Sequence, residues 1–372
     1  EIFSILGRLD IGVQKTSENS YEVSVPPYRV DVTQEADVIE EILRIYGFNN
    51  IALSETARTD FLAEFPAKSI DKYRRSVGEL LTGNGFFEIW TNSLTNQAYQ
   101  RRLDLSFTGE PVEILNKLSE EQGILRQTML FTGLEVCAYN INRKQKDLRL
   151  FEFGKIYSRE QGRYNEDERL ALYLTGNLET ENWQHKTIPV SYFDLAQQVA
   201  GVVSKSGMKQ TRQERIEDPL YEYGSSILFN DREIGKLGKV KSLILKDFGI
   251  RQELFYAELY TSLLFNAANP KLVIEDVPKF PEVKRDLSLV LDAPVRFSEI
   301  HDLAMSTEKK LIREVVAFDV YEGENIPRGK KAYALSFTML DETKTLTDQE
   351  IDRTMERLIH AFEKRLGAVI RK

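Results

Sequence analysis

The spacing of apolar residues near the N-terminus predicts a strand followed by a helix. Residues 21–25 alternate in polarity, as in a half-buried strand, and Pro26-Pro27 favours extended backbone after it. Apolar residues then recur at helical spacing up to Gly47, which is expected to end the helix, and Thr33 is its expected N-cap. The pattern of residues 1–53 therefore predicts a small module built from a helix and a hairpin.

The middle segment, residues 54–277, mixes helical and strand periodicities. After a polar connector at 54–65, Pro66 suits the first turn of a helix that Gly83 and Gly85 are expected to end. Further helices are expected at 129–143 and 192–206, and strands at 86–92, 112–115, 148–157, 170–175, 226–229, 233–240 and 254–259. Together with the hairpin signal Asn230-Asp231, this mixture predicts an α+β domain with a mainly antiparallel sheet.

The last segment, residues 278–372, follows a linker marked by Pro270, Pro278 and Pro281. Its expected order is strand 286–291, helix 297–308, strand 312–321, strand 331–340, helix 348–365 and strand 368–371. This βαββαβ order predicts a ferredoxin-like domain, whose open sheet face is often used to bind single-stranded RNA. The predicted fold class of the whole chain is therefore multidomain α+β.

Charge and composition limit the classes of function. The 372 residues carry a formal net charge of −8, which argues against electrostatic binding of nucleic acid by the whole surface. Residues 278–372 hold 17 basic and 17 acidic side chains, so residues 1–277 carry the entire net charge of −8. Any contact with a polyanion is therefore expected in the last third. No apolar run approaches the roughly 20 residues of a membrane-spanning helix.

The cysteine and the first residue bear on location and completeness. Cys137 is the one cysteine, so no intramolecular disulfide can form, and a cytoplasmic location is expected. The chain opens with Glu1 in the middle of a patterned segment, and we expect it to be a fragment of a longer protein.

Few residues are suited to catalysis. The three histidines lie far apart in sequence and, with one cysteine, form no recognisable zinc motif. A phosphate-binding loop of the G-x-x-x-x-G-K-[ST] type is absent from the sequence, and Gly235-Lys236-Leu237-Gly238 lacks the third glycine of a dinucleotide turn. Cys137 lies in an apolar helical stretch, which favours a buried structural thiol over a nucleophile.

Four carboxylates form the strongest local signal. Asp37, Glu40 and Glu41 stand at i, i+3 and i+4 on one helical face, and Asp31 precedes the helix. Clustered carboxylates repel one another, a cost that a hard cation such as Mg²⁺ removes. Acidic residues are equally typical of a helix N-terminus that faces water, and spacing alone leaves both interpretations open.

Several motifs together resemble one family. They are Pro27-Tyr28-Arg29-Val30-Asp31, Ile39-Glu40-Glu41-Ile42, Arg44-Ile45-Tyr46-Gly47-Phe48, Leu125-Arg126-Gln127-Thr128-Met129-Leu130, Leu150-Phe151-Glu152-Phe153-Gly154-Lys155, Arg285-Asp286-Leu287-Ser288 and Phe318-Asp319-Val320-Tyr321-Glu322-Gly323. In this order they resemble the phenylalanyl-tRNA synthetase beta subunits of bacterial type, over essentially the whole chain.

The resemblance implies a hetero-tetramer of two alpha and two beta chains, in which alpha activates phenylalanine with ATP and charges tRNA(Phe). This chain would be the non-catalytic partner, with a metal-binding module, a class II synthetase-like sheet domain and an anticodon-binding domain. Glu356-Arg357-Leu358 is its nearest imitation of the third catalytic motif, but no glycine stands in the eight residues before it. The editing domain of larger family members is not visible, so no editing activity is expected.

The family's binding residues carry over to this chain. Its Mg²⁺ ligands, shared with alpha, fall on Asp31, Asp37, Glu40 and Glu41. Its anticodon pocket falls on Asp319 and Tyr321, and Ala332 stands where some relatives have a small hydroxyl residue. Arg328, Lys330 and Lys331 follow in the next loop, where phosphate contact and, for the lysines, a solvated loop are both open interpretations. Two other hypotheses remain: a stand-alone RNA-binding or scaffolding protein, and a self-sufficient hydrolase, which is disfavoured because no candidate general acid is evident.

Overall fold

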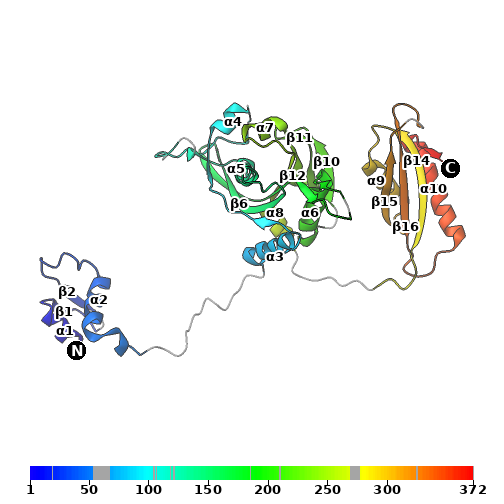
Figure 1. Ribbon diagram of the computed structural model, residues 1–372. Helices are drawn as coiled ribbons and strands as arrows, with labels where there is room; N and C mark the ends of the chain where they lie inside the picture. The colour runs from blue at the N-terminus through cyan, green and yellow to red at the C-terminus, as the bar shows by residue number, and fades with distance from the viewer. Residues whose placement is uncertain are drawn as a thin grey trace. The chain divides into compact units, whose positions relative to one another are not determined.

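A computed structural model describes residues 1–371, except residues 19, 53–67, 104, 106, 118, 120, 121, 185, 209, 210, 269–276, 324 and 325 (Figure 1). The chain divides into two compact units, Glu1–Asn269 and Pro270–Lys372. The predicted connector at 54–65, Pro66 and Pro270 lie outside the described residues. In the part that the structure describes, no helix is both long and apolar enough to cross a membrane.

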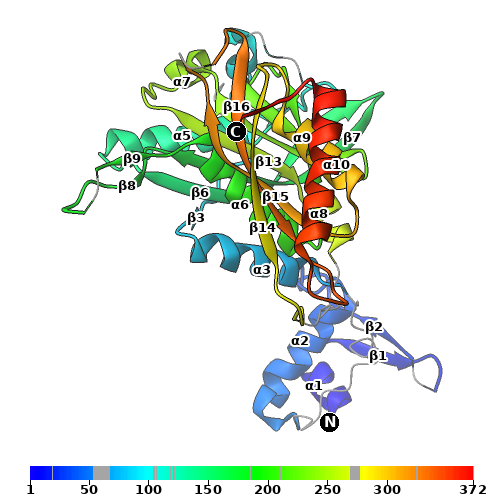
Figure 2. The same cartoon turned by 90° about the vertical axis from the view of Figure 1, so that its right-hand side faces the viewer.

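The N-terminal module contains α1 (Ile2–Arg8), β1 (Gly12–Lys15), β2 (Tyr21–Ser24), α2 (Glu35–Tyr46) and the 3₁₀ turn η1 (Phe48–Asn50). The two helices pack together beside the antiparallel β1/β2 hairpin (Figure 2). The expected cap at Thr33 is wrong, because Gln34 is the N-cap and forms a reciprocal capping box with Asp37. Gly47 ends the helix at φ 91°, as expected.

The central module is built on a seven-stranded sheet in the order β10-β11-β12-β13-β7-β6-β3. Its strands are β3 (Phe87–Glu88), β6 (Leu148–Glu160), β7 (Arg163–Thr175), β10 (Thr211–Ile216), β11 (Tyr221–Phe229), β12 (Arg232–Val240) and β13 (Leu254–Tyr260). Only the β3/β6 pair is parallel, so the prediction of a mainly antiparallel sheet is confirmed. Asn230 and Asp231 make the β11/β12 turn at φ 50° and 58°.

Helices cover both faces of this sheet (Figure 1). One face packs against α3 (Ile70–Gly83), α6 (Tyr192–Lys205) and α8 (Thr261–Ala267). The other packs against α5 (Leu130–Asn142) and α7 (Ser242–Asp247). The short elements are β4 (Leu94–Thr95), α4 (Ala98–Arg102), β5 (Ile124–Leu125), β8 (Asn177–Glu179) and β9 (Ile188–Pro189). The side chain of Cys137 is buried in the second core, as predicted.

Three expectations about strands are wrong at positions where the side chains are exposed to solvent. The strand expected at 112–115 does not form; Glu113 makes one isolated bridge, and Leu115 is 99% exposed. The strand expected at 86–92 shrinks to β3, and Trp90 beyond it is 98% exposed. β10 was not expected, because all but one of its residues are exposed and give no alternation.

The C-terminal module has the predicted βαββαβ order. It contains β14 (Val283–Asp292), α9 (Phe297–Thr307), β15 (Ile312–Tyr321), β16 (Lys330–Met339), α10 (Asp348–Leu366, red in Figure 2) and β17 (Val369–Arg371). The sheet order is β15-β16-β14-β17. Apolar side chains of α9 and α10 share one core with one face of this sheet. Among the described residues of this module, α9 and α10 pack on this one face of the sheet.

Candidate functional site

The four carboxylates of the N-terminal module have different partners. Asp37 accepts hydrogen bonds from the backbone N–H of Thr33 at 2.8 Å and of Gln34 at 2.9 Å. These backbone donors hold the pKa of Asp37 below its ordinary value. The Asp37 side chain is therefore used to cap α2, and Glu40 is exposed one turn further along.

Arg29 joins the other two carboxylates. Its Nη2 lies 3.0 Å from Asp31 Oδ2 and 3.0 Å from Glu41 Oε1, and Arg44 adds a second contact to Glu41 at 2.7 Å. The hydrogen bond from Arg29 holds the pKa of Asp31 below its ordinary value. Among the described residues, no three carboxylate, histidine or cysteine side chains are grouped so that they could hold a metal. Arginine side chains thus neutralise Asp31 and Glu41 in this structure.

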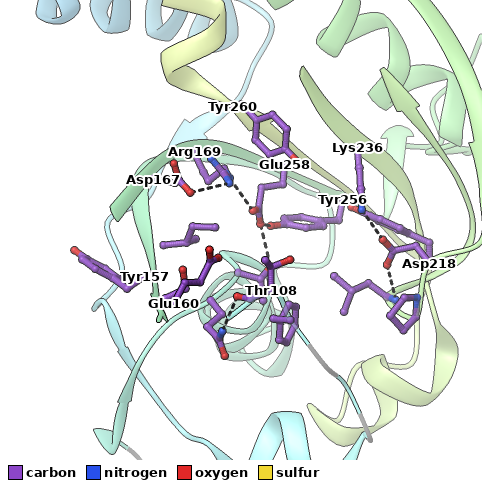
Figure 3. Close-up of a pocket in the computed structure, with 18 residues that line it drawn as sticks. Thr108, Tyr157, Glu160, Asp167, Arg169, Asp218, Lys236, Tyr256, Glu258 and Tyr260 are labelled. Carbon is purple, nitrogen blue, oxygen red and sulfur yellow. Dashed lines mark hydrogen bonds and ion pairs between the residues drawn. The ribbon is translucent and has the colours of Figure 1, made fainter. Parts of the chain in front are cut away.

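A pocket in the central module, which sequence reasoning did not identify, is centred on Glu258. Its carboxylate accepts hydrogen bonds from Thr128 Oγ1 at 2.9 Å, Met129 N at 3.0 Å and the Tyr256 hydroxyl (Figure 3). Arg169 Nε lies 3.4 Å from the other oxygen. Glu258 therefore links the start of α5 to two strands of the sheet.

The charges that line this pocket of about 490 Å³ are mostly negative. Its carboxylates are Glu160, Asp167, Asp218 and Glu258, and its cations are Arg169 and Lys236. Both cations are engaged: Arg169 with Asp167 and Glu258, and Lys236 with Asp218 at 3.0 Å. A triphosphate needs several available cations. The described lining offers none, so this pocket is unsuited to ATP.

A third candidate site lies on the open sheet face of the C-terminal module. A bulge between Ala317 and Asp319 shifts the register, so that Asp319 stands opposite Ala334 and Tyr321 opposite Ala332. Asp319 and Tyr321 are exposed and, being two residues apart, point to the same face. An exposed ring and an exposed carboxylate on one face suit a flat base, which can stack on Tyr321 while Asp319 accepts hydrogen bonds from its edge.

The structure separates the three expected basic residues. Arg328 is exposed in the turn before β16. Lys330 pairs with Asp292 at 3.0 Å, on the neighbouring strand. Lys331 Nζ lies 5.1 Å from the centroid of the Tyr333 ring, which belongs to the helix-covered core. Lys331 is therefore directed to the face opposite Asp319 and Tyr321.

Three family models match the chain, and two of the matched stretches overlap over residues 30–48. The phenylalanyl tRNA synthetase beta chain CLM domain matches residues 30–261. The chain belongs to the phenylalanyl-tRNA synthetase beta chain family. The tRNA synthetase B5 domain matches residues 1–48, and the ferredoxin-fold anticodon binding domain matches residues 278–371. The family resemblance expected from the motifs is thus confirmed.

Curated relatives carry the same family name. A phenylalanine–tRNA ligase beta subunit from Porphyromonas gingivalis is 39% identical over 99% of this chain and 46% of its own length. The subunit from Bacteroides fragilis is 38% identical over the whole chain and 47% of its own length. That from Listeria monocytogenes is 32% identical, again over the whole chain and 46% of its own length. The chain thus spans about half the length of these beta-chain relatives.

Proposed function

We propose that this chain is part of the non-catalytic beta subunit of a phenylalanine–tRNA ligase that acts in the cytoplasm. It supports ATP-dependent charging of tRNA(Phe), with the active site on an alpha subunit, in a hetero-tetramer of two alpha and two beta chains. The observation that carries the proposal is the match of three beta-chain domains in order along the chain. The pocket around Glu258 agrees with it, because its cations are already paired.

The anticodon of tRNA binds the open sheet face of the C-terminal module in this proposal. Asp319 and Tyr321 contribute base contacts, and stacking on an aromatic ring contributes about 1–3 kcal/mol per base. Arg328 and Lys330, at the start of β16, contact phosphates. The expected phosphate contact of Lys331 is given up, because its side chain lies on the helix-covered face beside Tyr333. Tyr321→Ala is expected to weaken tRNA(Phe) binding about tenfold or more, whereas Tyr321→Phe, which keeps the ring, is expected to bind nearly as wild type.

The alpha subunit binds, in part, the edge of the central sheet. Phe87, in the outermost strand β3, is 71% exposed, and Trp90, two residues beyond that strand, is 98% exposed. Exposed aromatic side chains of this kind are enriched in protein interfaces. A Phe87→Ser/Trp90→Ser variant should fold normally, because neither side chain is buried, and should bind alpha more weakly.

Mg²⁺ is bound by Asp31, Asp37, Glu40 and Glu41 together with groups of alpha. Carboxylate oxygens are the ligands that Mg²⁺ prefers. Arg29 pairs with Asp31 and Glu41 in the chain by itself, so Mg²⁺ has to displace its guanidinium from these two carboxylates. In the chain by itself Asp37 caps α2, so metal binding requires rearrangement at the first turn of this helix. The metal would supply positive charge that ties two acidic surfaces together.

Light scattering of the chain mixed with the alpha subunit of its host tests the proposal. A complex that is larger with Mg²⁺ than without it supports both the subunit assignment and the shared metal. Asp31→Asn/Glu40→Gln should remove the magnesium effect and leave the helix cap intact. Absence of any complex, combined with tRNA binding, would instead favour a stand-alone RNA-binding protein.

A further inference from the structure

Helix α10 separates its acidic and basic side chains into two neighbouring rows. Ile351, Thr354, Leu358 and Phe362 face the core. Arg353, Arg357, His360 and Lys364 follow at i, i+4, i+7 and i+11, which places them along one flank of the helix. Asp352, Glu356 and Glu363 form the neighbouring row. The overall charge balance of the module therefore hides a continuous basic stripe.

The stripe borders a groove at the end of α9. This groove of about 470 Å³ is lined by Ser306, Thr307, Arg357, His360, Ala361, Lys364 and Arg365. The lining thus contains three permanent cations and a histidine, and none of its described members is a carboxylate. The hydroxyl groups of Ser306 and Thr307 already donate to the Leu303 carbonyl and have no further proton for an anion. The affinity of the groove for an anion therefore comes from its cations.

One of these cations is fixed in place, and the others are available. Arg357 pairs with the buried carboxylate of Glu308, which also accepts from the backbone N–H groups of Lys310 and Leu311. Lys364 and Arg365 of the lining are exposed and form no ion pair with a described carboxylate, and neither does Arg353, which lies outside the groove at the start of the stripe. The groove therefore keeps an excess of positive charge beside a rigidly held arginine.

We propose that this groove between α9 and α10 binds the phosphodiester backbone of RNA. The stripe from Arg353 to Lys364 extends about 16 Å along the helix axis. Phosphates follow one another at about 3.4 Å per strand along a nucleic-acid duplex, so several can lie beside the stripe. The helical layer covers the sheet face opposite Asp319 and Tyr321, so the groove is a site separate from the proposed anticodon face.

The two faces have different tasks. Contacts to phosphates position a nucleic acid and are independent of sequence, whereas contacts to base edges specify it. The groove holds three permanent cations, and the imidazole of His360 is the one ring among its described lining residues, which include no Phe, Tyr or Trp. It is therefore expected to bind RNA irrespective of the anticodon. This inference rests on the proposed RNA binding by the C-terminal module, and the experiment separates the two.

The test is the salt dependence of tRNA(Phe) binding to the full chain, measured by fluorescence anisotropy. In the groove variant Lys364→Gln/Arg365→Gln, which removes two exposed cations of the lining, the negative slope of log K against log salt should become shallower by about 1.4–1.8, because each phosphate contact contributes about 0.7–0.9. The loss of affinity should be greatest at low salt, where counterion release favours binding most. Lys205→Gln/Lys246→Gln removes the same charge from the central module and should leave the slope unchanged.

Other outcomes overturn the proposal. If the groove variant keeps the wild-type slope, or changes no more than the control, the groove does not bind RNA. If inorganic phosphate binds the wild-type chain but not the groove variant, and the tRNA slope is unaltered, the groove takes a small phosphate compound instead.

A tRNA with an altered anticodon distinguishes the groove from the proposed function. If this altered tRNA binds the wild-type chain as well as tRNA(Phe) does, while the groove variant still makes the salt slope shallower, anticodon reading fails and the groove proposal stands. If it binds more weakly and the slope stays unchanged in the groove variant, anticodon reading stands and the groove proposal fails.

Discussion

Arg126 and Glu152 form an ion pair inside the central module, at 3.2 Å and with side chains only 3% and 2% exposed. Arg126 also donates to Thr91 and Thr132 hydroxyls and to the Lys155 carbonyl. Burying two charges is costly, and the pair persists because its donors and acceptors are satisfied. The pair therefore holds the β6 strand to the segment that precedes α5.

Removing one member of this pair should be strongly destabilising. Glu152→Ala leaves the Arg126 guanidinium buried without a counter-charge, which costs about 3–5 kcal/mol of the free energy of unfolding. Urea unfolding followed by circular dichroism measures the loss. If the alanine variant does not fold, Glu152→Gln, which retains hydrogen-bonding atoms, permits the same comparison.

The exposed pair Lys155–Glu166 is the matched control. Its atoms lie 2.7 Å apart, but its side chains are 46% and 55% exposed. Solvent screening limits such a pair to under about 1 kcal/mol, so Glu166→Ala should change stability little. Equal losses in Glu152→Ala and Glu166→Ala would contradict the role assigned to burial.

Gly133 is required by the close approach of α5 to the sheet. A Cβ atom at this position would lie 2.1 Å from Cζ of Tyr173, whose hydroxyl donates to the Met129 carbonyl at 2.6 Å. Gly133→Ala should therefore destabilise the chain by about 1–3 kcal/mol, because the buried ring must move. A shift in the urea midpoint measures this.

Gly78 in α3 provides the opposite case. A Cβ atom there would meet Phe151 Cζ at 3.9 Å, an ordinary contact. Gly78→Ala should stabilise the chain by about 0.5–1 kcal/mol, since alanine restricts the unfolded chain and favours the helix. A destabilised Gly78→Ala together with a neutral Gly133→Ala would contradict the packing of α3 and α5 against the sheet.

Local patterns were sufficient to predict the C-terminal module. β15 has the expected bounds, 312–321, and the other strands and helices there agree within three residues, because each contributes to one half-buried sheet or to a helix with an apolar face. The exposed edge strand β10 and the short helix α1 lacked that signal. β10 is held by its pairing with β11, and α1 is a short helix that buries two side chains, Ile5 and Leu6.

The sites were less predictable than the fold. The spacing of Asp37, Glu40 and Glu41 places them on one helix, but it does not show that Asp37 caps that helix or that Arg29 joins Asp31 to Glu41. The contact between Thr128 and Glu258 joins residues 130 apart in sequence. Such pairings are set by tertiary structure, and no local motif encodes them.

Stability of the C-terminal module should depend on pH through Glu308. Burial raises the pKa of Glu308, but hydrogen bonds from Lys310 N and Leu311 N and the contact with Arg357 outweigh it, and the net pKa lies below its ordinary value of 4.5. A carboxylate with a lowered folded-state pKa stabilises above its unfolded pKa, and this contribution is lost as pH falls. Wild type should therefore lose stability faster than Glu308→Gln below about pH 4.5.

Urea titrations between about pH 6 and pH 3 measure this difference. The stability gap between wild type and Glu308→Gln should be largest at the upper end and should shrink toward the lower end. Glu363→Gln, in the exposed acidic row of α10, is the control and should show no such closing gap. A gap that widens on acidification would reverse the assigned sign.

Cys137 should report the unfolding of the central module. Its side chain is fully buried, and burial raises the pKa of its thiol to about 12. Because the thiolate is the reactive form, Ellman's reagent should react very slowly with the native chain near neutral pH. In urea, reaction of this one thiol should follow the loss of circular dichroism, and Cys137→Ala should give no signal. A rapid reaction in native buffer, with helix content unchanged, would mean that α5 opens locally and would contradict its place in the sheet core.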